Sequence, residues 1–283
     1  KRQIQRTTTT TTNQIYICSM IVNLLNSSSK LNNTPIWFMR QAGRYLPEYK
    51  KIRQKTNTFL DLCFDSKLAA KVSLQPIIRF DFDAIIFFSD ILVIPHALNQ
   101  TVSFIDGVGP KLNPITSPDD LNLPTKTMFL SKLRSCFDTL KLIKKKKNDQ
   151  KNLIGFCGSP LTVLTYMIEG QTSKNHLKTK QLIRNNKKNI DKLIEILVDY
   201  SITYLDEQIK AGAEIIQLFE SWASIVNQTD FDKYVIDPNK EIVQRIKKIH
   251  PEIPIICFPR NNPEKLSDFI KNVDCDVLSV DLK

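Results

Sequence analysis

The sequence predicts an incomplete (β/α)8 barrel of the TIM type, in which about six of the strands are present. Six short apolar runs lack the polar alternation of a strand with one wet face, as is typical of parallel strands covered on both sides. Helix-like segments separate these runs. The predicted strands are residues 36–39, 84–88, 153–156, 215–218, 255–258 and 277–280.

Helix signals support this alternation. Apolar residues recur on one face between positions 190 and 205, which predicts a long helix that ends near Gly212. An N-cap residue followed by proline stands at 117–118, 237–238 and 262–263, and each pair predicts a helix start.

The series of strands and helices fits either a (β/α)8 barrel or a doubly wound sheet. No GxGxxG sequence or P-loop follows any strand, which weakens the nucleotide-binding alternative. A closed barrel needs two strands beyond the sixth, so we expect an open barrel with exposed strand edges. No repeat or linker divides residues 31–283, which we interpret as one domain.

Composition narrows the classes of function. The net charge is +11, but the lysines are scattered and no zinc finger or basic heptad accompanies them, so nucleic-acid binding is not expected. No apolar run approaches the roughly 18 residues of a membrane span, and no membrane partner is expected. The six cysteines lie far apart without a CxxC or HxC pair, which favours reduced core thiols over disulfides or a metal site.

Residues 1–30 differ from the rest of the chain. A threonine run at 7–12 and the lack of any acidic residue before Glu48 resemble a targeting segment. The chain begins with lysine, however, and Met20 offers an internal start. We therefore predict a disordered or non-native extension over residues 1–30, with a targeting segment as the alternative.

In a parallel barrel the chemistry lies at the carboxyl ends of the strands. Three of the seven glycines, Gly43, Gly155 and Gly158, occur at these ends, which fits close backbone approach to a ligand or an ordinary turn. The polar and charged residues at the predicted ends are Arg40, Gln41, Arg44, Ser89, Asp90, Glu220, Ser221, Arg260 and Asp281.

Four segments together resemble one family. PIWFMRQAGRYLPEY at 35–49 resembles the signature near the N-terminus of the uroporphyrinogen decarboxylases, and FSDIL at 88–92 resembles their second motif. GFCGSP and LTYMIEG, between 155 and 170, resemble a third, and LFESW at 218–222 a fourth. The four occur in family order, so the resemblance covers residues 34–282.

The resemblance implies a carboxy-lyase of haem biosynthesis that uses no cofactor and no metal. Such an enzyme removes four acetate carboxyl groups from uroporphyrinogen III and gives coproporphyrinogen III. The residue types agree, because arginine forks bind carboxylates bidentately and this substrate carries eight of them. The alternative is a surface loop in which the arginines pair with Glu48. The substrate contacts implied in the signature are Arg40, Gln41, Ala42, Gly43 and Arg44.

Asp90 ends a strongly apolar strand, where a carboxylate needs partners. The resemblance implies that Asp90 accepts the pyrrole N–H groups and stabilises the ring cation formed when a pyrrole carbon is protonated. It also places Arg40 beside the acetate that is lost, so both residues are assigned as catalytic. We expect Arg40 to lower the pKa of Asp90 more than burial raises it. The alternative for Asp90 is a helix N-cap.

The resemblance further implies that Tyr166 and Ser221 contact the substrate. The alternatives are a core aromatic side chain for Tyr166 and a helix cap for Ser221. Arg53 is either a further carboxylate partner or a solvent-exposed helix charge. We expect one cleft to be lined by Arg40, Arg44, Asp90, Tyr166 and Ser221.

Some family features have no counterpart in the sequence. The family has two further strands and a late glycine-flanked histidine, whereas His96, His176 and His250 are interpreted as surface or loop residues. Three hypotheses stay open: an active decarboxylase, a catalytically silent remnant that at most binds porphyrinogen-like anions, and a related methyltransferase. The last needs a zinc-binding His/Cys set that is not found. The resemblance also implies a homodimer in the cytoplasm.

Overall fold

The computed structural model describes Ile21 and residues 34–281. Apart from Ile21, the predictions for residues 1–30 fall outside the described residues. Ile21 itself is buried, and its backbone N–H donates to the side chain of Asn152 at 3.2 Å.

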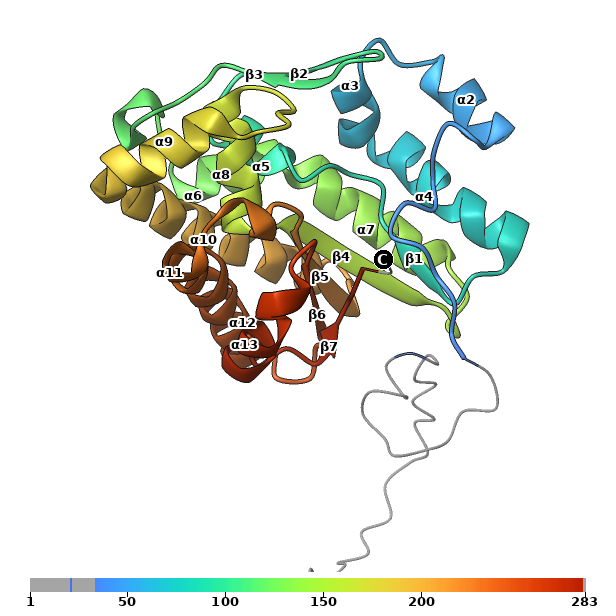
Figure 1. The fold of residues 1–283 in the computed structure, drawn as a ribbon. Helices are drawn as coiled ribbons and strands as arrows, with labels where there is room; N and C mark the ends of the chain where they lie inside the picture. The colour runs from blue at the N-terminus through green and yellow to red at the C-terminus, as the bar shows by residue number, and fades with distance from the viewer. Residues whose placement is uncertain (1–20, 22–33, 282–283) are drawn as a thin grey trace, which may run out of the picture.

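The main sheet has five parallel strands: β1 (Ala84–Ile86), β4 (Asn152–Gly158), β5 (Ile215–Glu220), β6 (Ile255–Pro259) and β7 (Val277–Leu278). They are hydrogen-bonded in the order β1-β4-β5-β6-β7, which is also their order along the chain (Figure 1). A doubly wound sheet reverses its order at a switch point, whereas a barrel does not. The fold is therefore a TIM-type α/β barrel that is not closed, as predicted.

Five of the six predicted strands are confirmed, but residues 36–39 do not form one. This segment is extended beside β1 and makes a single pair of hydrogen bonds with Asp83. The Ile36 N–H donates to the Asp83 carboxylate at 2.7 Å, and the Asp83 N–H donates to the Ile36 carbonyl at 2.9 Å. One side-chain acceptor cannot continue a ladder, so the pairing ends there.

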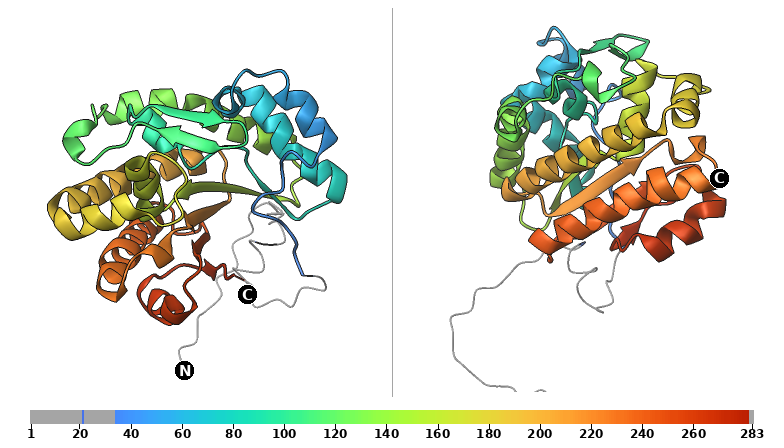
Figure 2. Two further views of the ribbon diagram at one scale, coloured as in Figure 1. Left: turned by 45° about the horizontal axis from the view of Figure 1, so that its top comes forward. Right: turned by 90° about the vertical axis from the view of Figure 1, so that its left-hand side faces the viewer.

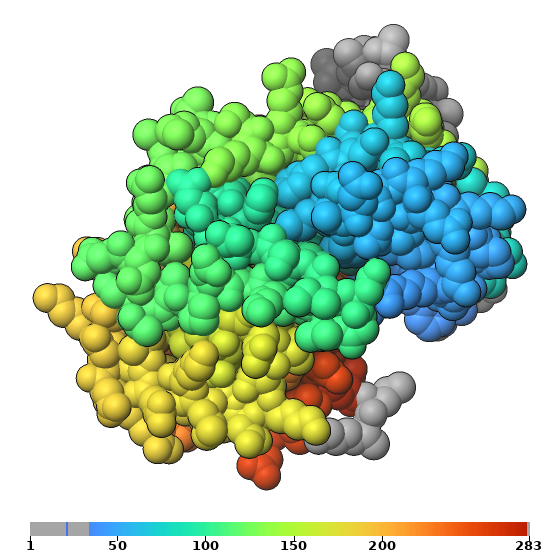
Figure 3. Space-filling view, turned by 90° about the horizontal axis from the view of Figure 1, so that it is seen from above, coloured from blue at the N-terminus to red at the C-terminus, as the bar shows by residue number. Residues whose placement is uncertain are grey.

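A second, antiparallel sheet was not predicted. It is a hairpin of β2 (Val102–Ile105) and β3 (Gly109–Leu112), joined by a turn that contains Gly107 at φ +80°. The hairpin lies at the top of the molecule in Figure 1. Seen from above, it crosses the face between the blue N-terminal residues and the yellow residues around α9 (Figure 3).

Helices alternate with the strands and cover the sheet, and α10 and α12 run side by side along the outside (Figure 2). The helical elements described are α2 Pro47–Arg53, α3 Phe59–Phe64, α4 Ser66–Phe80, α5 Val93–Ala97, α6 Lys126–Lys132, α7 Arg134–Lys146, α8 Pro160–Glu169, α9 Leu177–Asn185, α10 Lys187–Lys210, α11 Gln228–Phe231, α12 Asp237–Ile249 and α13 Leu266–Asn272, with short turns η1 Pro118–Asp120, η2 Ala223–Ile225, η3 Asp232–Ile236 and η4 Pro263–Lys265.

The helix predictions are confirmed with one correction. The long helix is α10, and the starts at 117–118 and 262–263 are present as η1 and η4. Helix α12 begins at Asp237 with Pro238 in its first turn, as predicted. Asp237 is not its N-cap, however, because α11 and the π-helical turn η3 run directly into α12. A π turn displaces the hydrogen-bonding pattern, and this lets Pro238 follow without its missing N–H breaking the helix.

The core is formed by the sheet and the inward faces of these helices. Strand β4 is buried along all seven residues, as expected for a strand covered on both faces. Cys63, Cys136, Cys157 and Cys257 are buried free thiols and Cys275 is partly buried, which confirms the predicted core cysteines within the described residues. In that same part of the chain, no helix is long and apolar enough to cross a membrane.

Candidate active site

The signature segment, residues 35–49, is hydrogen-bonded to the sheet through Gln41. This side chain is buried; its amide donates to the Ala84 carbonyl at 3.0 Å, and its oxygen accepts the Phe38 N–H at 3.3 Å. Tyr45 Oη donates to the Gln41 carbonyl. These bonds hold the exposed Arg40 beside the carboxyl end of β1.

Ala42 and Gly43 form the turn that follows. The Leu46 N–H donates to the Gly43 carbonyl at 3.0 Å, which leads the chain into α2. A methyl group on Gly43 would meet nothing nearer than the Tyr45 ring at 3.7 Å, so the turn itself leaves room for a side chain.

Packing within the protein requires glycine at positions 155 and 158. A Cβ on Gly155 would lie 2.5 Å from the Gln208 side chain, and one on Gly158 would lie 2.7 Å from Val163 and 2.9 Å from Ile91. Close approach of helices to β4 therefore explains both glycines without a ligand.

Asp90 lies just beyond β1, where Phe88 N–H donates to the Ser73 hydroxyl at 2.7 Å. The Asp90 side chain is half-buried, and its Oδ1 accepts the Leu92 N–H at 2.9 Å. Helix α5 begins at Val93 with Leu92 as its N-cap, so Asp90 is not the cap residue. Its second carboxylate oxygen has no hydrogen-bond donor within the described part of the chain.

Burial controls the ionisation of Asp90. It raises the pKa of the carboxyl to about 6, against opposing effects of the Leu92 N–H and of Arg40. The expectation that Arg40 would outweigh burial is therefore wrong in direction. The physical reason is that the exposed guanidinium is screened by solvent, whereas the carboxyl has lost much of its hydration. The group is still mostly ionised at pH 7.

Tyr166 projects from α8 toward the same place. Its ring lies 6.0 Å from the Trp222 ring. Burial raises the pKa of the phenol first of all, the charge of Asp90 raises it further, and the charges of Arg40 and Arg260 lower it. Asp90, Arg40 and Tyr166 therefore share one electrostatic environment, and Arg260 belongs to it as well.

Ser221 follows β5 and is half-buried. The short helix η2 begins two residues later with Trp222 as its N-cap, so Ser221 does not act as a helix cap. The Trp222 N–H donates to the Thr162 hydroxyl at 3.2 Å, which ties this turn to α8. The turn thus brings Ser221 and Trp222 to the side of the site where Tyr166 lies.

A buried carboxyl beneath this turn escaped the assignment of site residues. Glu220 is fully buried and hydrogen-bonded to Thr162, and the Asn239 amide donates to it at 3.5 Å. Asn239 in turn accepts from the Ser159 hydroxyl at 2.8 Å. Burial raises the pKa of Glu220 to about 8, so its carboxyl is mostly protonated at pH 7. The only sign of Glu220 in the sequence is its position just after an apolar strand.

Arg44 has a partner that was not foreseen. It pairs with Asp106 in the hairpin turn at 3.0 Å, and Arg53 lies 4.0 Å from the same carboxylate. Glu48, the partner of the surface-loop alternative, pairs instead with Arg79 at 2.9 Å. Arg44 is mostly exposed, whereas Arg53 is largely buried and donates to the Thr56 carbonyl.

His176 lies in the loop before α9, as the prediction of a surface or loop residue allows. Its side chain is buried, and its ring centroid lies 4.5 Å from that of Trp222. His96 and His250 are partly buried. Across the described residues no group of three or more His, Cys, Asp or Glu side chains is arranged to hold a metal ion.

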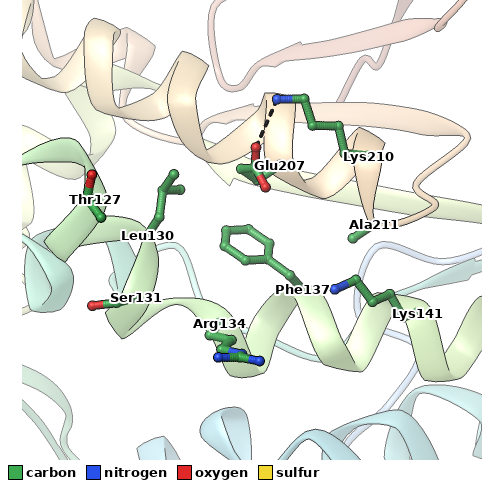
Figure 4. Close-up of a pocket in the computed structure, with 9 residues that line it drawn as sticks. All are labelled: Thr127, Leu130, Ser131, Arg134, Phe137, Lys141, Glu207, Lys210 and Ala211. Atoms are coloured by element: carbon green, nitrogen blue, oxygen red, sulfur yellow. Dashed lines mark hydrogen bonds and ion pairs between the residues drawn. The ribbon is translucent and has the colours of Figure 1, made fainter.

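A cavity of about 550 Å³ lies elsewhere, between α6, α7 and α10. Its lining combines the Leu130 and Phe137 side chains with charged groups, among them the Lys210–Glu207 ion pair at 2.9 Å (Figure 4). None of the residues that line it is a predicted site residue.

The fold and the strand-end residues define a TIM-barrel enzyme. The family model for uroporphyrinogen decarboxylase (URO-D) matches residues 22–283, and the chain belongs to that family. It is 46% identical to the uroporphyrinogen decarboxylase of Orientia tsutsugamushi (strain Ikeda) over 264 residues, which are 93% of this chain and 76% of that protein. It is 42% identical to that of Rickettsia felis over 261 residues, 92% of this chain and 75% of the relative.

A solved structure agrees on the fold. A methyltransferase from Methanosarcina mazei superposes with a TM-score of 0.73 over 92% of this chain and 74% of that protein. At 14% sequence identity this likeness concerns the barrel alone. The chain spans about three quarters of the length of the curated relatives.

Proposed function

We propose that this chain catalyses the decarboxylation of the four acetate side chains of uroporphyrinogen III, giving coproporphyrinogen III, and that it works as a cytoplasmic homodimer. The observation that carries the proposal is the half-buried Asp90 at the end of β1. Among the described residues one of its oxygens accepts no hydrogen bond, and Arg40 and Tyr166 share its electrostatic environment. The family membership of the chain supports the same reaction.

The chemistry follows from what a carboxylate can do under a pyrrole ring. A proton added to the ring carbon next to an acetate makes the ring a cation and provides a sink for electrons. The bond to the carboxylate then breaks, carbon dioxide leaves, and its electron pair neutralises the ring. Protonation of the resulting exocyclic methylene gives the methyl group, and loss of the proton first added to the ring carbon restores the aromatic pyrrole. The net change is that one proton replaces each carbon dioxide.

Asp90 would stabilise the cationic ring through its free oxygen and the pyrrole N–H groups. A negative charge fixed where positive charge develops lowers the barrier without reorganisation of solvent. Arg40 would hold the acetate that is lost, and Arg44 another carboxylate, through bidentate hydrogen bonds. Tyr166 and Ser221 would contact the remaining carboxylates and the ring, with the backbone of Gln41, Ala42 and Gly43 completing that wall.

The proposal predicts that Asp90→Asn mainly lowers kcat. The amide keeps the shape of the side chain and loses the charge, a change typically worth about 10² to 10³ in rate. The measurement is anaerobic formation of coproporphyrinogen III by the wild type and the variant, with kcat and KM determined separately. Asp149→Asn, in an exposed loop, is the matched control and should leave both constants unchanged.

Equal rates for Asp90→Asn and the wild type would remove Asp90 from the mechanism. A wild type that binds uroporphyrinogen III but forms no product would favour the alternative of a silent, anion-binding remnant.

A further inference from the structure

We propose that Arg260 and the indole N–H of Trp222 form a second carboxylate-binding subsite, on the β5–β6 side of the active site. This inference rests on the proposed function. The arginines of the signature segment lie on the β1 side, at the opposite part of the open sheet. A polyanion as wide as a tetrapyrrole would therefore meet cationic groups on both sides.

Hydrogen bonds between two loops fix the position of Arg260. It follows β6, and its backbone N–H donates to the Glu220 carbonyl at 3.1 Å. Two residues later the Asn262 amide donates to the Ala223 carbonyl at 3.4 Å. The carboxyl ends of β5 and β6 are thus held together, with Trp222 and Arg260 on adjacent loops.

The charge of Arg260 acts on the proposed site. It lowers the pKa of the Tyr166 phenol, as the charge of Arg40 also does. Its one ion-pair partner among the described residues is Asp281, at a long 3.7 Å. Asp281 also accepts the Asn261 N–H at 2.6 Å, so that carboxylate is already engaged. The half-exposed guanidinium therefore retains most of its hydrogen-bonding capacity for a ligand.

Trp222 provides an independent observation. Its indole nitrogen is buried, yet it has no hydrogen-bond acceptor within the described chain. The N–H lies close enough to the Tyr166 oxygen to lower the pKa of that phenol, but the two atoms do not have hydrogen-bond geometry. Nearly all buried donors are satisfied in folded proteins, so an unsatisfied one on the loop next to Arg260 indicates an acceptor that a ligand would supply.

The ligand group is a substrate carboxylate other than the one being lost. Both acetate and propionate side chains carry such a group. Only the propionates survive all four reactions, so the product distinguishes the two. If the subsite binds a propionate, changing Arg260 should weaken the binding of coproporphyrinogen III as well as of uroporphyrinogen III. If it binds an acetate, the change should weaken the binding of uroporphyrinogen III alone.

The test uses Arg260→Gln, Asp281→Asn and the control Arg184→Gln, which removes an exposed arginine on α9. Arg260→Gln should raise KM for uroporphyrinogen III roughly tenfold, the usual scale of a lost charged hydrogen bond, and leave kcat within about twofold. Asp281→Asn should lower KM, because it keeps the bond to Asn261 and removes the competing charge. The control should change neither constant.

The opposite changes in KM expected for Arg260→Gln and Asp281→Asn distinguish a substrate-binding role of Arg260 from a purely structural one. If the Arg260–Asp281 pair were only structural, both variants would shift Tm alike and leave KM unchanged, which would overturn the subsite. If the wild type shows no turnover, the Kd for uroporphyrinogen III replaces KM. Weaker binding by Arg260→Gln would then keep the subsite and reject the proposed reaction, and no binding by the wild type would reject both.

Discussion

The residues around Asp90 come from separate segments of the chain: Arg40 precedes α2, Tyr166 lies on α8 and Arg260 follows β6. Motifs located Asp90, Arg40 and Tyr166, which the fold brings into one electrostatic environment. The pKa of Asp90 was misjudged, because its direction depends on how deeply the carboxyl is buried and how well the arginine is hydrated. Glu220 and Arg260 were visible as strand-end residues, but only tertiary contacts reveal a buried acid and a guanidinium whose ion pair with Asp281 is long.

Glu220 leads to a prediction about pH and stability. Its folded pKa is about 8, well above the usual 4.5, so the folded state binds more protons than the unfolded state between these values. Stability should therefore fall as pH rises from about 4.5 to 8 and level off above that. Glu220→Gln removes this ionisation and keeps an acceptor for the Thr162 hydroxyl.

The measurement is the free energy of unfolding in urea at pH 5 and pH 8. The decrease in the free energy of unfolding from pH 5 to pH 8 should be larger in the wild type than in Glu220→Gln, by an amount on the order of a few kcal/mol. Glu195→Gln, exposed on α10, should behave like the wild type. Identical losses in the wild type and Glu220→Gln would mean that Glu220 is not protonated in the folded state.

At the scale of elements, the strands that were predicted well are those buried on both faces. The strand predicted at residues 36–39 is not formed. An apolar run predicts that a segment is buried, but it does not ensure that a neighbouring strand offers backbone groups for a hydrogen-bonded ladder. The β2–β3 hairpin was missed although it carries a recognisable signal, Asp106-Gly107 between two short runs. Helix α12 begins at 237–238 as predicted, but Asp237 is not its N-cap, because the preceding π turn η3 has no local sequence mark.

The hairpin suggests a role for Asp106, because its carboxylate neutralises Arg44 and lies near Arg53. Asp106→Asn should lower KM for uroporphyrinogen III severalfold, since it frees Arg44, which is proposed to bind a carboxylate. Arg44→Lys should raise KM, because it keeps the charge and loses the planar fork. Steady-state kinetics of both variants provide the measurement.

The Tm of the two variants is the control for effects of the Arg44–Asp106 ion pair on stability. Both partners are mostly exposed, and such ion pairs contribute about 0–1 kcal/mol, so Tm should hardly change in either variant. A KM for Asp106→Asn equal to or above that of the wild type would show that the pair does not compete with substrate.

For the whole molecule, the order of the strands decided the architecture. Sequence alone left a barrel and a doubly wound sheet open, because both alternate strands with helices. The unbroken order β1-β4-β5-β6-β7 excludes a switch point and places every strand end on one edge. The same order leaves β1 and β7 each with one strand neighbour in the five-stranded sheet, whereas β4, β5 and β6 each have two.

This difference predicts a gradient of local stability across the sheet. Backbone hydrogen bonds in β4 and β5 are covered on both sides, and the seven residues of β4 are all buried. Strand β7 has only two residues, both partly exposed, and pairs with β6 alone. Opening β7 therefore exposes little apolar surface, whereas opening β4 disrupts the core.

Amide hydrogen exchange of residues 1–283 provides the measurement. Amides of β4 and β5 should exchange slowest, through openings close to global unfolding, and amides at residues 277–279 should exchange faster by orders of magnitude. Val102 and Leu112, buried in the hairpin, should fall between these limits. Protection in β7 as high as in β5 would show that another surface, such as a partner subunit, covers that edge.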